Sequence, residues 1–430
     1  MVLRRIDLRT SGAELDEVLP RPTTPSGGPI DVVREILAGV RANGDDAVRA
    51  YTERFDGVTL DGLVVDPATI DAALDRIDPH VRKALEQAAE RIRAYHEAQM
   101  PASIAVDHPG LSIQGMHRPV ERAACYVPGG RAVYPSTVLM TAVPASVAGV
   151  DEIVLCVPPG PAGAVPDVVL AAAAVAGVRE VVSVGGAQAI GAVAFGTESI
   201  RPVDVIVGPG NVYVALAKQE VAGLVGVPSS FAGPSEVVVV ADGSAPAAYA
   251  AIDVIVQAEH GPDGLAWFVT WDEAFADEVL SAIERLVATA PRQAEIEATL
   301  EASGIAVLCA SAEQAMAVAN FIAPEHLELQ TADDDALLPL VRNAGAIFCG
   351  ANAPASLGDY AAGPSHVLPT NGTARFASAL TVRDFMKDLH VVRVEREGFE
   401  ALADTVEVLA GAEGLDAHAA SIRIRRGASR

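Results

Sequence analysis

The sequence is poor in aromatic residues and in basic residues, and each shortage narrows the classes of protein that it can encode. Only 4% of its 430 residues are Phe, Trp or Tyr although 50% are hydrophobic, so the core must be built from Ala, Val, Ile and Leu, as in many α/β proteins. Its 31 basic residues against 56 acidic ones give a net charge of −25. Such a chain repels phosphate backbones, which argues against nucleic acid as a partner.

Long hydrophobic runs and paired cysteines are also missing. The longest unbroken apolar run, 168–178, falls well short of the roughly 18 residues of a membrane helix. No apolar run follows the first residues as it would in a signal peptide, so we expect a cytosolic protein without membrane contact. None of Cys125, Cys156, Cys309 and Cys349 forms a C-x-x-C pair, so we expect no disulfide and favour small buried thiols. A thiol nucleophile would need a neighbouring base, which the sequence does not reveal.

The length of the chain predicts two large domains with smaller pieces. Residues 1–25 are polar and proline-rich, and we expect an N-terminal arm there. From residue 123 onward strand-like and helix-like segments alternate, which predicts parallel sheets with right-handed crossovers. We expect a first α/β domain from 26–122 together with 236–380, a second from 123–235, and a C-terminal tail of one strand and two helices in 381–430. The strands are expected at 123–127, 153–157, 180–184, 204–207, from 236, and at 265–270, 305–308 and 346–349.

One helix end brings two possible metal ligands together. The apolar stretch from Ala245 closes with Gln257-Ala258-Glu259-His260 and a Gly-Pro stop. Gln257 and His260 are three residues apart, so they share one face of a helix and can reach the same point. They could form half of a metal site, although a histidine at a helix C-terminus also serves as a cap.

Glycine turns after strands indicate possible dinucleotide sites. Gly208 and Gly210 fit the first two positions of a G-x-G-x-x-G pattern, but the third falls on Tyr213. Gly185-Gly186 lacks a third glycine as well. Plain turn chemistry is therefore an equal explanation of these glycines.

Three further segments carry groups suited to proton transfer or metal binding. Pro324-Glu325-His326-Leu327-Glu328 follows a helix and is expected to turn, so that its Glu and His serve as acid and base or form a charged loop. Asp359 lies in what reads as a long glycine-rich loop, 358–366, and could supply a carboxylate ligand. Glu413 and His418 lie in the tail, where His418 by itself would be taken for a surface histidine.

Together these segments resemble the histidinol dehydrogenase family from about Ile30 to the C-terminus. The resemblance implies two incomplete Rossmann-like domains of the aldehyde-dehydrogenase kind. It rests on ordered blocks at matching separations: Tyr126–Gly130, Pro135–Met140, Gly208–Asn211, Gly233–Glu236, Gln257–Gly261, Pro324–Leu327, Gly358–Tyr360 and His366–Thr370.

The resemblance also implies roles for named residues. One Zn²⁺ per subunit would be held by Gln257, His260, Asp359 and His418. His326 would act as the base and Glu325 would activate water, both in the first α/β domain. Substrate would contact Ser235, His366 and Glu413 together with His326 and the four metal ligands. NAD would be held on the second domain by Tyr126, Gln188 and Asn211.

The activity so implied is the NAD-linked oxidation of L-histidinol to L-histidine through the aldehyde. Family members are dimers that exchange their tails, so we expect a homodimer with shared active sites. Two other enzyme classes could use similar residues: a zinc hydrolase, and an aldehyde dehydrogenase with Cys309 or Cys349 as nucleophile. A non-catalytic interaction protein would be expected to have lost some ligands, and all four are present.

Overall fold

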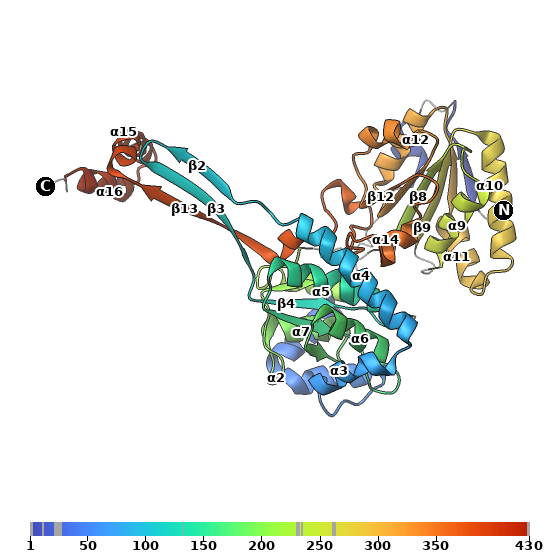
Figure 1. Ribbon diagram of the computed structural model, residues 1–430, viewed down its shortest axis with the longest axis horizontal. Helices are drawn as coiled ribbons and strands as arrows, with labels where there is room; N and C mark the ends of the chain where they lie inside the picture. Colours follow the sequence, from blue (N-terminus) through green and yellow to red (C-terminus); the bar gives the residue numbers. More distant parts are fainter. Residues whose placement is uncertain are drawn as a thin grey trace.

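Two bodies, each built on a parallel sheet, and a slender projecting arm make up the chain (Figure 1). The computed structural model describes residues 3–10, 13–20, 28–130, 132–228, 233, 235–259 and 264–427. All strand pairs in the two larger sheets are parallel, which confirms the α/β class.

The first body contains a four-stranded sheet in the order β6-β5-β4-β7. Its strands begin and end within two residues of the predicted ones, because each is a short, mostly apolar and mostly buried run that ends at a turn. The elements are β4 (Arg122–Tyr126), α5 (Pro135–Ala148), β5 (Glu152–Cys156), α6 (Asp167–Ala176), β6 (Glu180–Val182), α7 (Gly186–Phe195), β7 (Val205–Val207) and α8 (Val212–Val221).

The helices that precede this sheet pack against it. They are α2 (Ile30–Asp56), α3 (Pro67–Arg76) and α4 (Pro79–Ala98). Ile70 and Ile92 join the core on the α5 and α6 side, and Val33 joins the core on the α7 side. The expected grouping of residues 26–122 with 236–380 therefore does not match the packing. Helical periodicity shows that a helix has an apolar face, but not which sheet that face will cover.

The second body contains a six-stranded sheet in the order β1-β10-β9-β8-β11-β12. Alternate side chains of its strands enter separate cores on the two faces, with Val237 and Val239 on the α9 side and Val238 and Val240 on the α12 side. The elements are β8 (Glu236–Ala241), α9 (Ala247–Ala258), β9 (Leu265–Thr270), α10 (Glu273–Val287), α11 (Gln293–Ser303), β10 (Ile305–Leu308), α12 (Ala312–Ile322), β11 (His326–Gln330), α13 (Asp334–Leu337), β12 (Ala346–Cys349) and α14 (Ala355–Tyr360).

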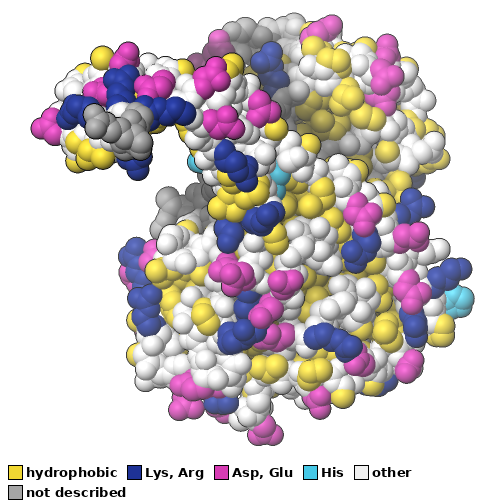
Figure 2. All heavy atoms as spheres, turned by 60° about the vertical axis from the view of Figure 1, so that its left-hand side comes forward, with side chains coloured by type: hydrophobic (Ala, Val, Ile, Leu, Met, Phe, Trp, Pro, Cys, Tyr) yellow, Lys and Arg dark blue, Asp and Glu magenta, His cyan; other side chains and the backbone are white. Residues whose placement is uncertain are grey.

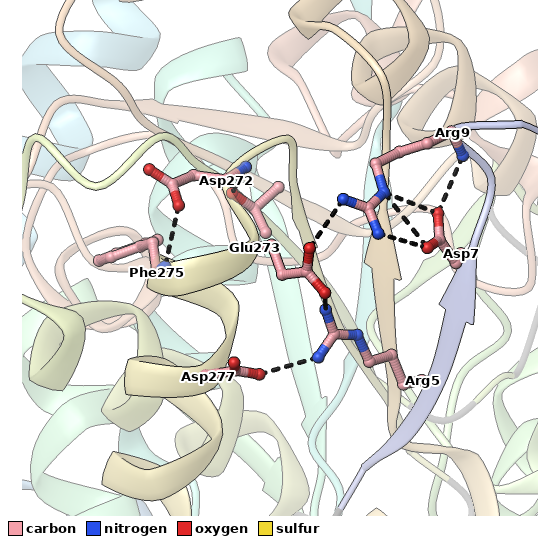
Figure 3. A network of polar contacts seen from close by, with 8 residues as sticks. Arg5, Asp7, Arg9, Asp272, Glu273, Phe275 and Asp277 are labelled. Atoms are coloured by element: carbon pink, nitrogen blue, oxygen red, sulfur yellow. Dashed lines mark hydrogen bonds and ion pairs between the residues drawn. The ribbon is translucent and has the colours of Figure 1, made fainter.

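The N-terminal residues belong to this sheet rather than to a free arm. β1 (Arg4–Asp7) pairs in parallel with β10, and α1 (Leu15–Val18) follows. Arg5 and Arg9 both bind Glu273 at the start of α10, and Arg5 also reaches Asp277 (Figure 3). The polar residues that suggested an arm belong to an edge strand, whose charged side chains face solvent.

Two segments that were expected to be loops are regular elements. Residues 326–330 form β11, a fully buried strand between β8 and β12, so the expected charged loop is wrong. Glu325 itself lies in a bend just before the strand, where a turn was predicted. Asp359 lies on α14 and not in a structureless loop. Both segments contain polar residues whose partners come from distant parts of the chain, and local sequence carries no signal of them.

The arm is a three-stranded antiparallel sheet that carries two helices at its tip (Figure 1). Its strands are β2 (Ile104–His108), β3 (Leu111–Pro119) and β13 (Met386–Val394), and its helices are α15 (Arg396–Ala412) and α16 (Asp416–Gly427). The predicted tail of one strand and two helices is confirmed. Basic, acidic and hydrophobic side chains are interspersed over the arm (Figure 2). Of the helices that the structure describes, none is long and apolar enough to cross a membrane.

Candidate active site

The candidate site lies where the two bodies meet. The carboxyl ends of β4 and β7 face the amino ends of β8 and β11, and a cavity of about 80 Å³ between them is lined by Ser235, Glu325, His366, Gly208 and Lys218 among others. His366 Nε2 lies 3.1 Å from the hydroxyl oxygen of Thr137 on α5, which joins the two bodies directly.

Glu325 and His326 stand at the start of β11 and are 6% and 5% exposed. The Glu325 carboxylate accepts a hydrogen bond at 3.0 Å from the backbone N–H of Glu236 on the neighbouring strand. It also accepts one from the Ser235 hydroxyl. Sheet pairing between β8 and β11 thus brings Ser235 and Glu325 together, although they are far apart in the sequence.

The two ring nitrogens of His326 have different environments. Nδ1 donates to the carbonyl oxygen of Glu236 at 3.1 Å, and Nε2 lies 3.5 Å from Oδ1 of Asp359. Because a neutral imidazole carries one proton, a donating Nδ1 leaves the lone pair on Nε2. His326 is therefore oriented to accept a proton through Nε2, on the side of Asp359.

Burial and mutual interaction shift both members of this pair. Burial raises the pKa of Glu325 to about 7, although His326 and hydrogen bonds favour its charged form. For His326 burial acts to lower the pKa, but the carboxylates of Glu325 and Asp359 outweigh it and raise the pKa to about 9. Two adjacent buried proton-transfer groups with strongly shifted pKa values are a pattern typical of active sites.

Gln257 and Asp359, two of the predicted metal ligands, lie on two helices of the second body. Gln257 is the next-to-last residue of α9; its side-chain amide is buried, and its Nε2 has no hydrogen-bond partner among the described residues. Since amide O and N are assigned from hydrogen bonding, this orphaned group could equally present its oxygen. Asp359 is held by α14, and its backbone carbonyl accepts a hydrogen bond from His366 Nδ1 at 2.9 Å.

The remaining predicted ligands are not gathered here within one chain. His260 lies outside the described residues. Glu413 and His418 are exposed at the tip of the arm, far from α14 in Figure 1. Accordingly, the described part of the chain contains no group of three His, Cys, Asp or Glu side chains that could hold a metal ion.

The three residues expected to contact NAD line one cavity of about 660 Å³ on the first body. The Tyr126 hydroxyl accepts from the backbone N–H of Gly186 at 3.0 Å, which fixes the turn into α7. Gln188 is buried in the first turn of that helix. Asn211 caps α8 by accepting from the N–H groups of Tyr213 and Val214, both at 3.1 Å.

The glycine turn at 208–210 separates this cavity from the smaller one. Gly208 has φ 101°, and a Cβ there would lie 2.1 Å from the carbonyl oxygen of Tyr126, so a side chain cannot be accommodated. The Lys218 ammonium donates a hydrogen bond to the Gly208 carbonyl oxygen. Burial lowers the pKa of Lys218 to about 8.

Sequence reasoning missed several residues at the site. Glu236 is 1% exposed, and its Oε1 accepts from the backbone N–H of Asn371 at 3.1 Å, which anchors the loop that follows His366. Glu328 and Asp253 are also buried. An isolated charged residue inside an otherwise apolar run, as Asp253 is within α9, was the available signal.

Comparison with known proteins agrees with the family resemblance of the sequence over nearly the whole chain. The profile of the histidinol dehydrogenase family matches residues 20–426. A histidinol dehydrogenase of Pseudomonas putida is 49% identical over 397 residues, which cover 91% of this chain and 90% of that protein.

Solved structures extend this likeness to three dimensions. Histidinol dehydrogenase from Elizabethkingia anophelis matches with a TM-score of 0.95 at 32% identity, covering 99% of this chain and 98% of that one. An acetylating aldehyde dehydrogenase from Geobacillus thermoglucosidasius, at 15% identity and a TM-score of 0.50, covers 85% of this chain and 97% of that one and shares the fold. The chain therefore belongs to the histidinol dehydrogenase family.

Proposed function

We propose that this protein oxidises L-histidinol to L-histidine in two NAD-linked steps through L-histidinaldehyde, at the end of histidine biosynthesis. The observation that carries the proposal is the buried Glu325–His326 pair, which faces Asp359 at the junction of the two bodies. Family membership supplies the substrate, and the geometry supplies an acid–base pair beside a cavity of dinucleotide size.

NAD⁺, when bound, would accept one hydride in each of the two oxidations. In the first oxidation, His326 Nε2 accepts the proton of the substrate alcohol. The Glu236 carbonyl holds Nδ1–H throughout, so the ring keeps its orientation. Water then adds to the aldehyde: Glu325 accepts a proton of that water, and the aldehyde oxygen takes back the proton held by His326, which leaves the imidazole neutral again. In the second oxidation His326 accepts a hydroxyl proton of the hydrated aldehyde, and the product acid releases its remaining proton to solvent as the carboxylate.

A zinc ion fits the donor groups of the predicted metal ligands. Gln257, His260 and Asp359 would hold it, with His418 as the fourth ligand. The support within the described residues is the buried amide of Gln257 with its orphaned atom and the Asp359 carboxylate beside His326. When bound, zinc would orient the amino and imidazole groups of the substrate and favour their neutral forms.

The arm explains how His418 and Glu413 could reach a site. Neither lies near the candidate site of its own chain (Figure 1), and several large apolar side chains at the tip are exposed, including Val408 at 70% and Leu409 at 57%. We propose a homodimer in which each arm crosses to the other subunit. Glu413 and His418 would then complete the partner's site, where Ser235 and His366 also contact substrate.

NAD would occupy the 660 Å³ cavity, with Tyr126, Gln188 and Asn211 among its contacts. This placement would direct the nicotinamide past the 208–210 turn toward Glu325, because Gly208 and Gly210 line the smaller cavity and Asn211 lines the larger one.

The test is a spectrophotometric assay with the full-length protein. L-Histidinol and excess NAD⁺ should yield two reduced nicotinamides per molecule of histidinol consumed. A chelator should abolish the reaction and added Zn²⁺ should restore it. Absence of reduced nicotinamide from zinc-loaded, folded protein would refute the proposed activity, and full activity after exhaustive chelation would refute the metal alone.

The two rival enzyme classes lack structural support. A thiol mechanism would need an accessible, activated cysteine, but Cys309 is buried and its burial raises its pKa to about 12. Cys349 is exposed, contrary to the expectation that all four cysteines are buried, yet its pKa is also raised, by partial burial and two nearby aspartates. A zinc hydrolase would leave the large cavity beside the glycine turn without a purpose.

A further inference from the structure

A second buried polar cluster lies one layer below the candidate site, and none of the steps above uses it. It consists of Asp253 on α9 and of Glu328 and Gln330 on β11, which are 8%, 0% and 3% exposed. Gln330 Nε2 donates to Asp253 Oδ2 at 2.6 Å and to Glu328 Oε2 at 2.9 Å. The two carboxyl groups also share a hydrogen bond with each other. We refer to these three residues as the buried network.

The buried network reaches a third element through Glu328. Its Oε1 accepts at 2.9 Å from the backbone N–H of Ala355, the first residue of α14. The network therefore bonds α9, β11 and α14 together. Each of these elements also carries one residue of the candidate site: Gln257, His326 and Asp359 respectively.

The spacing along the three elements is matched. Gln257 follows Asp253 by four residues and Asp359 follows Ala355 by four, so each pair shares a helix face with a rise of about 6 Å. His326 precedes Glu328 by two residues on the same face of β11, a distance of about 6.6 Å along a strand. The three site residues thus form one layer, and the network forms a parallel layer below it.

The orientation of β11 supports this two-layer arrangement. Leu327 and Leu329 enter the core on the α12 side of the sheet, so His326, Glu328 and Gln330 point to the opposite side, where α9 packs. The contact of His326 Nε2 with Asp359 Oδ1 at 3.5 Å shows that the upper layer is closed between β11 and α14.

We propose that Asp253 and Glu328 are positioning residues that set the height and rotation of α9 and α14, so that Gln257 and Asp359 face one metal ion together. The inference rests on the proposed zinc site. Apolar side chains could fill the same space at lower cost, because buried carboxyl groups are expensive. What hydrogen-bonded carboxyl groups add is a fixed geometry between three elements, as outer-shell partners of metal ligands do elsewhere.

The protonation of the pair is consistent with this role. Burial and the nearby Asp253 raise the pKa of Glu328 to about 8, and burial also raises the pKa of Asp253. At neutral pH the pair accordingly retains a proton, which links the two carboxyl groups and avoids two adjacent buried charges.

The test measures zinc affinity directly, by competition with a chromophoric chelator on the full-length protein. Glu328→Ala removes the acceptor for Ala355 and should weaken zinc binding by about 10-fold to 100-fold. Glu328→Gln keeps an acceptor for the same N–H and should stay within a few-fold of wild type. Asp253→Ala should match Glu328→Ala, and the double variant should be no weaker, because both disrupt one unit.

A matched control separates positioning from general stability. Asp45, 6% exposed in α2, accepts from the backbone N–H of Ser199 at 3.3 Å and lies on the first body, away from the metal ligands. Asp45→Ala should lower the melting temperature and leave zinc affinity unchanged. The melting temperature and circular dichroism of every variant are recorded alongside. If one alanine variant does not fold, the other and the Glu328→Gln comparison still decide the question.

The outcomes are distinguishable. Wild-type protein that binds no zinc would overturn the metal site and the positioning role together. Wild-type protein that binds zinc, with Asp253→Ala or Glu328→Ala binding it equally well, would overturn the positioning role alone. Weakened binding in these variants but not in Asp45→Ala supports it.

Discussion

Exchange of the arm can be tested by mixing two inactive variants. Glu325→Gln removes a proposed catalytic group from the body of a subunit, and His418→Ala removes a proposed metal ligand from the tip of its arm. In a homodimer of either variant every active site carries one lesion, so each preparation should be inactive by itself. If the arm of one subunit completes the site of the other, a mixed dimer has one site with both lesions and one with none.

The expected recovery follows from two-fold symmetry. Random reassociation of equal amounts makes about half of the dimers mixed, and half of the sites in these are intact, so activity should return to about a quarter of wild type. If each arm served its own chain, every site in the mixture would retain one lesion and activity would not return.

The assay is formation of reduced nicotinamide after the two variants are dissociated, mixed and reassembled, with subunit exchange verified by native mass spectrometry. A mixture of Glu413→Ala with His418→Ala is the matched control: both lesions lie on arms, so every site remains damaged and no recovery is expected. Absence of recovery in the first mixture despite verified exchange would refute arm exchange, as would recovery in the control.

Three further predictions concern single residues. His326→Gln should slow single-turnover oxidation of both alcohol and aldehyde by ~10²-fold or more, whereas Glu325→Gln should slow only that of the aldehyde; equal losses in the Glu325 variant would contradict the division of roles. Cys309→Ala should keep turnover within a few-fold, and a loss of several orders of magnitude in folded protein would revive the thiol mechanism. Burial and Glu325 raise the pKa of Glu236 from 4.5 to about 8, so its protonated form contributes stability that is lost as pH rises. Relative to Glu236→Gln, the unfolding free energy of wild type should fall by up to about 1.4 kcal/mol per pH unit between pH 4.5 and 8 in urea titrations; a difference that does not vary with pH would show that Glu236 is charged in the fold.

The sequence was most informative where a strand was a continuous apolar run between turns. β9 and β10 lie at the residues predicted for them, since such runs need no knowledge of their neighbours. β11 was missed because the adjacent Glu325 and His326 cannot both face inward from one regular strand, which implied a turn. In the structure Glu325 precedes the strand and only His326 belongs to it. Its polar face is buried by α9 and α14, whose hydrogen-bonding groups come from distant parts of the chain.

The candidate site, too, could be predicted only in part from the sequence. Motifs identified residue types such as Glu325, His326 and Asp359, because the chemistry requires those groups. They could not show that the backbone of Glu236 orients His326, since that contact exists only once β8 and β11 pair. Nor could they show which body the helices of residues 30–98 cover, because an apolar helix face is compatible with either sheet.

The pairing of the arm has a consequence for the order in which a ribosome delivers the chain. β2 and β3 are synthesised early, but β13 emerges only after both parallel sheets have been made. Because a ribosome adds about 5–20 residues per second, one edge of β3 stays unpaired for roughly tens of seconds. β1 waits in the same way for β10. Each of these edges is a template for pairing with another nascent chain. The strands and helices of the first body are contiguous in the chain, so its sheet can form meanwhile, although Leu380, Val382 and Phe385 complete its core later. We therefore expect the arm and the second body to depend most on chaperones during synthesis.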